Sequence, residues 1–385
     1  MFDKRNELFP VKNEQVYLLH CGIAPLYSRA MQAEYRIAEE HQKYGSRVFE
    51  KKYEQILDGL HRAAGELIRT NPSNLSFVKN TSEGVSLIAS GYRFSPGDQI
   101  IVYTHEYPAN FYPWLLQERR GVEVVLLEDD KTAETDTPRP TSWSLDDLER
   151  LITKKTKIVA LSHVQFTSGY AADLRQLGEL CFSEGIDLVV DAAQSLGALP
   201  VYPEEMHIAA LSASGWKWLL GPIGTGLMYT SEEFRERLDT VAAGAELMRQ
   251  GTDYLNHRWN PHESARRFEY STSPVSLAAA LETSIREIPL VYGVEQIRRE
   301  LFRLQELAAE MIDTNGYTPL VHPEKHRSGI LSVVCKRQSA DEVVDELEKH
   351  HVICSSRGGY LRLAPHFYNT DDEIEKAVGL LNAIR

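Results

Sequence analysis

Short apolar runs alternate with amphipathic stretches from about residue 75 to residue 230. The apolar runs are rich in Val, Ile and Leu, which is typical of buried strands. They predict strands at Leu75–Lys79, Gln99–Tyr103, Glu123–Leu127, Lys157–Ser162, Asp187–Asp191, Ala209–Ala213 and Gly226–Tyr229. The amphipathic stretches predict helices at Ser82–Tyr92, Asn110–Arg120, Leu145–Thr153 and Leu174–Glu184. This alternation predicts an α/β domain whose sheet is mostly parallel and covered on both faces.

The pattern changes after about residue 270, where a long helical stretch is expected over roughly Val275–Thr314. A smaller α/β unit follows, with expected elements at Gly329–Cys335, Ala340–His350, Val352–Ser355, Leu361–Leu363 and from Thr370 to Arg385. We therefore predict a large domain over residues 16–265. Residues 1–15, which could pack on either unit, are assigned with residues 266–385 to a small domain.

Composition and charge narrow the classes of function. The chain has 385 residues, of which 43% are hydrophobic and 25% are charged, as in ordinary globular proteins. Its net charge of −13 argues against nucleic acid as a partner. The 4 cysteines lack metal-ligand spacing and resemble the reduced thiols of a cytoplasmic protein. Because the cysteines lack that spacing, we expect no bound metal. No stretch has the length and apolarity of a signal peptide or membrane span, so we expect no membrane partner.

Lys217 is the most informative residue, because it is the only charged residue between His207 and Glu232. Trp216 and Trp218 flank it, and a Gly-rich turn follows. A lysine costs several kcal/mol to remove from water unless it is paired, neutralised or used covalently. Most lysines of this kind pack their stem on apolar surface and keep the amine in water. The residues that follow favour a functional amine instead.

Two polar groups stand at predicted strand ends, where open α/β sheets bind ligands. Asp191 ends an apolar strand and could pair with a cationic ring nitrogen or with an ordinary cation. Asn80, Thr81 and Ser82 begin a helix, where hydroxyls and free N–H groups suit a phosphate. Simple capping of that helix is the alternative.

An aromatic ring and two arginines complete the set. Tyr107 follows another strand and could stack on a planar ring, although core packing is the commoner role of a tyrosine. Arg357 and Arg362 could grip a carboxylate or form structural ion pairs. Together with Lys217 and Asp191, these side chains are what pyridoxal phosphate and an amino-acid substrate require.

The chain resembles the class V aminotransferases, which are fold-type-I pyridoxal-phosphate enzymes. The resemblance covers nearly the whole chain from about Tyr17, and its strongest motifs are Val190–Gln194 and Ser214–Lys217. It implies a large domain with a mostly parallel seven-stranded sheet and a smaller C-terminal α/β domain. It also implies pyridoxal 5'-phosphate as cofactor, with binding residues Thr81, Ser82, Tyr107, Asp191, Gln194, Ser214, Lys217 and Thr272.

Each of these residues has a role by the same resemblance. Lys217 is the catalytic Schiff-base lysine, and Asp191 pairs with the pyridine nitrogen. Gln194 hydrogen-bonds the phenolic oxygen, and Tyr107 takes the place of a ring-stacking histidine. The hydroxyls that hold the phosphate are those of Thr81, Ser82 and Ser214. Arg362 binds the substrate α-carboxylate. Thr272 would reach the phosphate of a neighbouring subunit, so the resemblance implies a homodimer.

Departures from the relatives limit the prediction of the reaction. Cysteine desulfurases carry a mobile loop whose cysteine takes up sulfur as a persulfide. Here the segments Cys354–Gly359 and Tyr360–Arg362 are joined directly, and Cys354 lies in a predicted strand, where it reads as a small buried hydrophobe. Trp216 replaces the histidine before the lysine. His163 could touch the cofactor, although a hydrogen-bonded structural histidine is the commoner case.

The sequence therefore predicts a small-molecule substrate, an α-amino acid, and action at its Cα or Cβ by transamination or by β-elimination of the C–S lyase type. Amino-acid epimerisation, cysteine desulfuration and non-catalytic cofactor binding stay open as alternatives. A nucleotide-binding α/β protein is disfavoured, because the chain has neither G-x-G-x-x-G after its first strand nor a G-x-x-x-x-G-K-[ST] loop.

Overall fold

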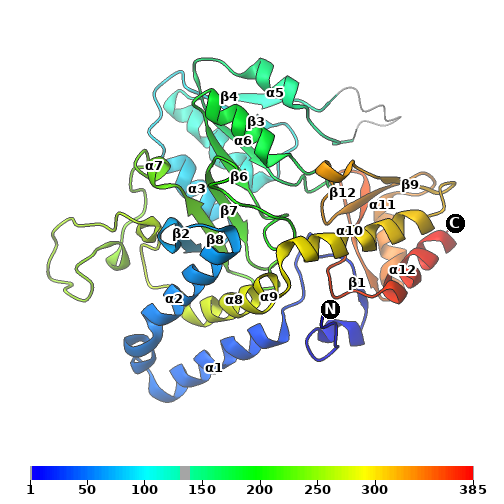
Figure 1. Cartoon of the computed structure of the whole chain (residues 1–385), viewed down its shortest axis with the longest axis horizontal. Coiled ribbons are helices and arrows are strands. Elements are labelled where there is room, and N and C mark those ends of the chain that lie inside the picture. The colour runs from blue at the N-terminus through cyan, green and yellow to red at the C-terminus, as the bar shows by residue number, and fades with distance from the viewer. Residues whose placement is uncertain (1, 131–138, 385) are drawn as a thin grey trace.

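The computed structural model describes residues 2–130 and 139–384, and a seven-stranded sheet forms its centre (Figure 1). In sheet order the strands are β2 (Leu75–Val78), β8 (Gly226–Thr230), β7 (Ile208–Ser214), β6 (Asp187–Asp191), β5 (Thr156–Ser162), β3 (Gln99–Tyr103) and β4 (Glu123–Leu127). Strands β3 to β7 are parallel, and β8 runs antiparallel to both of its neighbours. The predicted α/β fold and mostly parallel sheet are confirmed.

Both faces of this sheet are buried, because successive side chains of each strand point to opposite faces. One face packs against α2 (Arg47–Ile68), α5 (Leu145–Leu151), α6 (Leu174–Ser183) and α8 (Val275–Glu287). The other packs chiefly against α3 (Thr81–Gly91). Thus Ile101 and Val159 belong to the first core, whereas Ile100 and Ile158 belong to the second. Burial on both faces accounts for the near-continuous apolar runs of the sequence.

The helices differ from the prediction in three places. The helices α1 (Ser28–Tyr44) and α2 were not anticipated at all. The segment expected as one helix at Asn110–Arg120 consists of short pieces around α4 (Tyr112–Leu115). The long helical stretch expected at Val275–Thr314 consists of three helices, α8, α9 (Pro289–Tyr292) and α10 (Val294–Met311).

The breaks in the last of these segments have a local cause. Ile288 precedes Pro289, and a residue before proline is disfavoured in the helical region. Gly293 has a φ of 80°, which a right-handed helix does not accommodate. None of the described helices, including α7 (Glu232–Arg235), is long and apolar enough to cross a lipid bilayer.

A second sheet lies in the C-terminal part of the chain, at the right of Figure 1. It is antiparallel, in the order β12 (Ser355–Arg357), β13 (Tyr360–Leu363), β10 (Leu331–Cys335) and β9 (Tyr317–Leu320). Helices α11 (Ala340–Lys349) and α12 (Asp371–Ala383) contribute to its core, and each begins with a capping box. The N-terminal strand β1 (Val16–Tyr17) pairs with β11 (Val352–Ile353) beside this unit. The domain boundaries stay a prediction.

Candidate active site

The candidate site lies at the carboxyl ends of the central strands. Strands β5, β6 and β7 end at Ser162, Asp191 and Ser214, and Asp191 is in register with Ser162 on one side and Ser212 on the other. Helix α3 begins beside them, because its first residue Thr81 shares a hydrogen bond of 2.8 Å with the Ser214 hydroxyl. Parallel strands therefore gather polar side chains from distant parts of the sequence at one edge.

A cavity of about 460 Å³ opens at this edge, within the range of about 300–1,000 Å³ that is typical of small-molecule sites. The structure brings most of the predicted site residues together along its wall. Those that line it are Thr81, Ser82, Tyr107, Asp191, Gln194, Ser214, Lys217 and Arg362. The further candidates Trp216 and Arg357 line it too. Thr272 is exposed and is not part of this wall.

One end of the cavity has features that suit an anion. Asn80 caps α3, since its side chain accepts from the Glu83 N–H at 2.8 Å, as the simpler interpretation of this segment expected. Thr81 and Ser214, whose hydroxyls bond to each other, line the cavity at the helix start, where backbone N–H groups favour negative charge. Gly84 lets α3 approach β7, because a Cβ there would lie 2.3 Å from the Ser212 hydroxyl.

Lys217 sits in the turn after β7, with its side chain partly buried. A close contact fixes this turn: a Cβ at Gly215 would lie 2.3 Å from Oγ1 of Thr225. The Lys217 Nζ lies 5.6 Å from the centroid of the Tyr107 ring and makes no hydrogen bond or ion pair with a described residue. Burial lowers the pKa of the amine, although the carboxylate of Asp191 opposes that shift. More of the uncharged, nucleophilic amine is therefore present than in a surface lysine.

Asp191 provides a carboxylate in the floor of the cavity, where it is 4% exposed. Its Oδ1 accepts from the Ala193 N–H at 2.8 Å, and its Oδ2 accepts from no described residue. Burial raises its pKa, while the Ala193 N–H and the Lys217 amine lower it. A carboxylate with one open oxygen in such a place is suited to a cationic nitrogen.

Gln194 is held from two sides. Its Nε2 donates to the Cys21 carbonyl at 2.8 Å, and its Oε1 accepts from the Trp218 Nε1 at 3.0 Å. One Nε2 hydrogen is left over by these bonds. That hydrogen is available to an acceptor in the cavity.

Two arginines reach the cavity from the β12–β13 hairpin. Arg362 is 3% exposed and donates to the Phe166 carbonyl at 2.5 Å and to the Ser355 hydroxyl at 2.8 Å. Its Nε has no partner, and no described carboxylate pairs with it. Arg357 is exposed, and its guanidinium donates to the Ser356 carbonyl at 2.8 Å. A buried guanidinium without a counter-ion is ready for an anionic ligand.

Other candidates stand apart from this cavity. His163 lines a separate hollow, and burial lowers its pKa to about 3, so the ring is neutral. Cys354 is buried as expected, and burial raises the pKa of its thiol to about 12.

Sequence reasoning missed Cys21 in the cavity wall and the buried Glu106, which precedes the wall residue Tyr107. Glu106 is buried directly before Tyr107, and its carboxylate accepts from the Ser162 N–H at 2.7 Å and from Gln165 at 3.2 Å. A glutamate between an apolar strand and Tyr107 was the available signal. Cys21 is 2% exposed and lines the cavity, and no local pattern marked it.

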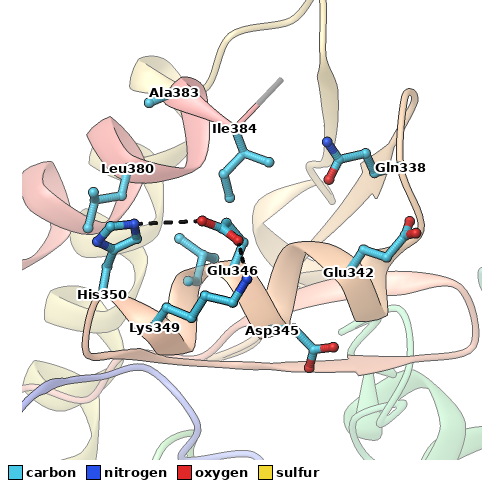
Figure 2. Close-up of a pocket in the computed structure, with 10 residues that line it drawn as sticks. Gln338, Glu342, Asp345, Glu346, Lys349, His350, Leu380, Ala383 and Ile384 are labelled. Carbon is cyan, nitrogen blue, oxygen red and sulfur yellow. Dashed lines mark hydrogen bonds and ion pairs between the residues drawn. The ribbon is translucent and has the colours of Figure 1, made fainter.

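A larger hollow of about 710 Å³ lies far from this chemistry, between α11 and α12 (Figure 2). Its wall includes exposed charged side chains that pair among themselves. The Glu346 carboxylate forms an ion pair with Nζ of Lys349 at 2.7 Å and lies 3.7 Å from Nε2 of His350, as Figure 2 shows. None of the predicted site residues lines it. We therefore take the smaller cavity at the strand ends as the candidate active site.

The residues of the smaller cavity fit pyridoxal phosphate. The donors at the start of α3 match a phosphate, the open oxygen of Asp191 matches a ring nitrogen, and the free amine of Lys217 matches an aldehyde. The unpaired Nε of Arg362 adds a place for a carboxylate beside them. Each part of the cofactor and of an amino acid thus has a complementary side chain.

Comparison with known proteins agrees with this fit. Two relatives are a probable cysteine desulfurase from Methanothermobacter thermautotrophicus, 25% identical over 97% of this chain and 95% of the relative, and one from Pyrococcus abyssi, 27% identical over 88% and 84%. The apo structure of a cysteine desulfurase from Thermococcus onnurineus NA1 matches with a TM-score of 0.86 at 25% identity, over 97% of this chain and 96% of that one.

A complex of a cystine C–S lyase with its product cysteine persulfide matches in fold with a TM-score of 0.89 at 19% identity, over 97% of this chain and 99% of that one. The family model described as aminotransferase class-V matches residues 17–375. The resemblance read from the sequence is confirmed. This chain belongs to the class-V aminotransferase family, and it is a pyridoxal-phosphate enzyme of fold type I.

Proposed function

We propose that this chain is a C–S lyase that removes a sulfur substituent from Cβ of an α-amino acid. The observation that carries the proposal is the two-residue turn Gly358–Gly359, which joins β12 directly to β13. Cysteine desulfurases place a persulfide-forming cysteine in a mobile loop, and this turn leaves no space for one. Cys354 before the turn is buried with a raised pKa, so it is a poor nucleophile. The sulfur would then be released instead of being held on a loop.

The cavity residues have separate tasks in this chemistry. Pyridoxal phosphate, when bound, draws electrons away from Cα of the amino acid joined to it. Lys217 would hold the cofactor at rest and then take the Cα proton as general base. Its lowered pKa supports that role, because the amine must be uncharged to accept a proton. Asp191 would keep a proton on the ring nitrogen, and Tyr107 would cover the ring.

Substrate binding rests on the arginines of the β12–β13 hairpin. Arg362 would bind the α-carboxylate, because its guanidinium is buried without a counter-ion. Arg357 and Arg362 lie on the same face of the hairpin, since Arg357 pairs with Tyr360 and Arg362 with Ser355. Such diagonal neighbours are roughly 7–8 Å apart. A substrate with a second acid group at its far end, such as cystine, would engage both.

Product analysis tests the proposal. Holoenzyme is incubated with cysteine, cystine and alanine, each with and without keto acids. A lyase converts cysteine and water into pyruvate, ammonia and hydrogen sulfide without a keto acid. A requirement for a keto acid would instead identify a transaminase and overturn the proposal.

Arg357→Ala should raise KM for cystine more than KM for cysteine, with Arg299→Ala on the exposed side of α10 as the matched control.

A second candidate function is cysteine desulfuration, and Cys21 is the observation that favours it. Cys21 is part of the cavity wall, and its thiol lies close enough to influence the pKa of Lys217. In that reaction the Cys21 sulfur bonds to the substrate Sγ, the Cβ–S bond breaks, and Cβ receives the thiol proton. The products are alanine and a Cys21 persulfide. Mass spectrometry of the protein after incubation with cysteine distinguishes this outcome from pyruvate release.

We also propose that the active protein is a homodimer. Thr272 is exposed and lies outside the cavity of its own chain, as a residue that serves a neighbouring subunit would. A projecting segment, yellow-green at the left of Figure 1, exposes Tyr254, Leu255 and Trp259 by 64%, 91% and 61%. Leu255→Asp with Trp259→Asp should yield a monomer in light scattering, and a wild-type monomer would refute the proposal.

The cytoplasmic location stays a prediction.

A further inference from the structure

Trp218 connects the lysine turn to a residue of the cavity wall. Its indole ring is completely buried, and its Nε1 donates to Oε1 of Gln194 at 3.0 Å. The other end of the same amide donates from Nε2 to the Cys21 carbonyl at 2.8 Å. Gln194 itself lines the cavity. The indole and the carbonyl thus hold the amide at its two ends.

These two bonds fix which way the Gln194 amide points. If the amide were rotated by half a turn, its NH₂ group would face the indole N–H and its oxygen would face the Cys21 carbonyl. Both contacts would then join like partners, donor to donor and acceptor to acceptor. In the observed orientation one Nε2 hydrogen remains for an acceptor in the cavity, so Trp218 decides whether Gln194 presents a donor or an oxygen there.

The far edge of the same indole rests on the C-terminal unit. A Cβ at Gly329, just before β10, would lie 2.3, 2.7 and 2.9 Å from three carbons of the Trp218 six-membered ring. The Trp218 carbonyl also accepts from Nε2 of His366 at 3.1 Å. The ring belongs to a buried cluster that contains Ile330 and Phe367. Any shift of the chain at Gly329 therefore displaces the indole, and with it the hydrogen bond to Gln194.

We propose that Trp218 is the positioning residue that keeps an N–H of Gln194 directed at the cofactor, and that the contact with Gly329 makes this donor sensitive to the placement of the C-terminal unit. The inference rests on the proposed contact between Gln194 and the phenolic oxygen of pyridoxal phosphate. A donor at that oxygen stabilises its ionised form. Loss of the donor should therefore raise the pH at which the visible absorbance of the bound cofactor changes.

The test is a pH titration of the absorbance of the holoenzyme. Trp218→Phe removes the indole N–H, and we expect the midpoint of the titration to rise by about 0.5–1 pH unit, the effect of one lost hydrogen bond. Gly329→Ala leaves every hydrogen-bonding group in place but crowds the ring, and we expect a rise in the same direction. Gln194→Leu sets the largest shift that loss of this donor can produce.

Two matched variants control for lost volume and for an added methyl. Trp143→Phe removes the same atoms from a buried indole whose N–H has no described partner. Gly379→Ala adds a methyl in α12, where no atom lies within 4 Å. Neither variant should move the midpoint by more than the spread among repeated titrations of the wild-type holoenzyme. Circular dichroism checks that each variant is folded.

The outcomes separate the inference from the function on which it rests. A wild-type protein without cofactor absorbance contradicts the proposed function. A Gln194→Leu protein with the wild-type midpoint contradicts the role of Gln194. If Gln194→Leu shifts the midpoint and Trp218→Phe does not, the positioning role of Trp218 is refuted. If Trp218→Phe shifts it and Gly329→Ala does not, the link to the C-terminal unit is refuted while the positioning role stands.

Discussion

Glu106→Gln should change how the stability of the protein depends on pH. The wild-type carboxylate is 7% exposed, and burial is the largest cause that raises its pKa from 4.5 to about 7. The neighbouring charge of Asp191 adds to that rise, whereas hydrogen bonds from Ser162 and Gln165 oppose it. Glutamine resembles the protonated acid, since its oxygen can accept from the Ser162 N–H and its NH₂ group can donate to the Ser162 hydroxyl.

The size of the effect follows from linkage. The folded protein holds this proton up to a higher pH than the unfolded chain, so the stabilisation is complete below the unfolded pKa. It is lost as the pH rises from 4.5 to about 7. The full difference is about 3 kcal/mol, of which about 2.5 kcal/mol falls between about pH 5 and about pH 8. The variant has no proton to lose, so its stability relative to wild type should rise by that amount over the same window.

Urea unfolding measured at several pH values checks this prediction. We expect the difference in unfolding free energy between Glu106→Gln and wild type to grow between about pH 5 and about pH 8 and then to level off. Glu118→Gln, at an exposed position, is the matched control and should show no such trend. A difference between Glu106→Gln and wild type that is the same at every pH would show that Glu106 ionises normally, and the account of its buried environment would be wrong.

Four further predictions concern the cavity and its surroundings. Borohydride reduction of the holoenzyme should attach the cofactor to the peptide that contains Lys217, and Lys217→Ala should lose both that label and the visible absorbance. Arg362→Lys should raise KM by about 10- to 100-fold, because a point charge replaces a fork of donors. Gly215→Ala should lower the unfolding free energy by about 1–3 kcal/mol, measured in urea, since its Cβ would lie 2.3 Å from Thr225 Oγ1. Cys354→Ala should leave the rate of sulfide release unchanged, and a loss of that rate would restore a sulfur-accepting role.

The central strands were predictable because their signal is local. Burial on both faces demands continuous apolar residues, so Gln99–Tyr103 and Asp187–Asp191 were predicted with the bounds that the structure has. Helix α1 was missed because only Ser28, Ala30 and Ile37 of its residues are buried, which leaves a weak apolar stripe. Pro289 and Gly293 divide the helical stretch that was expected at Val275–Thr314, and both are helix-breaking residues that the sequence itself displays.

The candidate site was partly predictable for a different reason. Asp191, Thr81 and Ser214 lie at strand ends or helix starts, and topology alone brings such positions together. The bond between Trp218 and Gln194 was not predictable, because it depends on how a turn folds back over 24 residues. Glu106 was missed for a similar reason, since its raised pKa arises from burial by neighbours in space.

The charges of the cavity are opposite in sign to those of the whole molecule, and this difference bears on the substrate. The chain carries a net charge of −13, yet the charged residues that line the described cavity are Lys217, Arg357, Arg362 and a single carboxylate, Asp191. A concave basic site with low-dielectric walls concentrates anions. Asp191 has one open oxygen, which a protonated ring nitrogen would satisfy. If pyridoxal phosphate binds as proposed, with its ring nitrogen at Asp191 and its phosphate at the start of α3, the two arginines would remain for the substrate. This balance favours an amino acid that brings at least one carboxylate, and it disfavours a substrate that is only an amine.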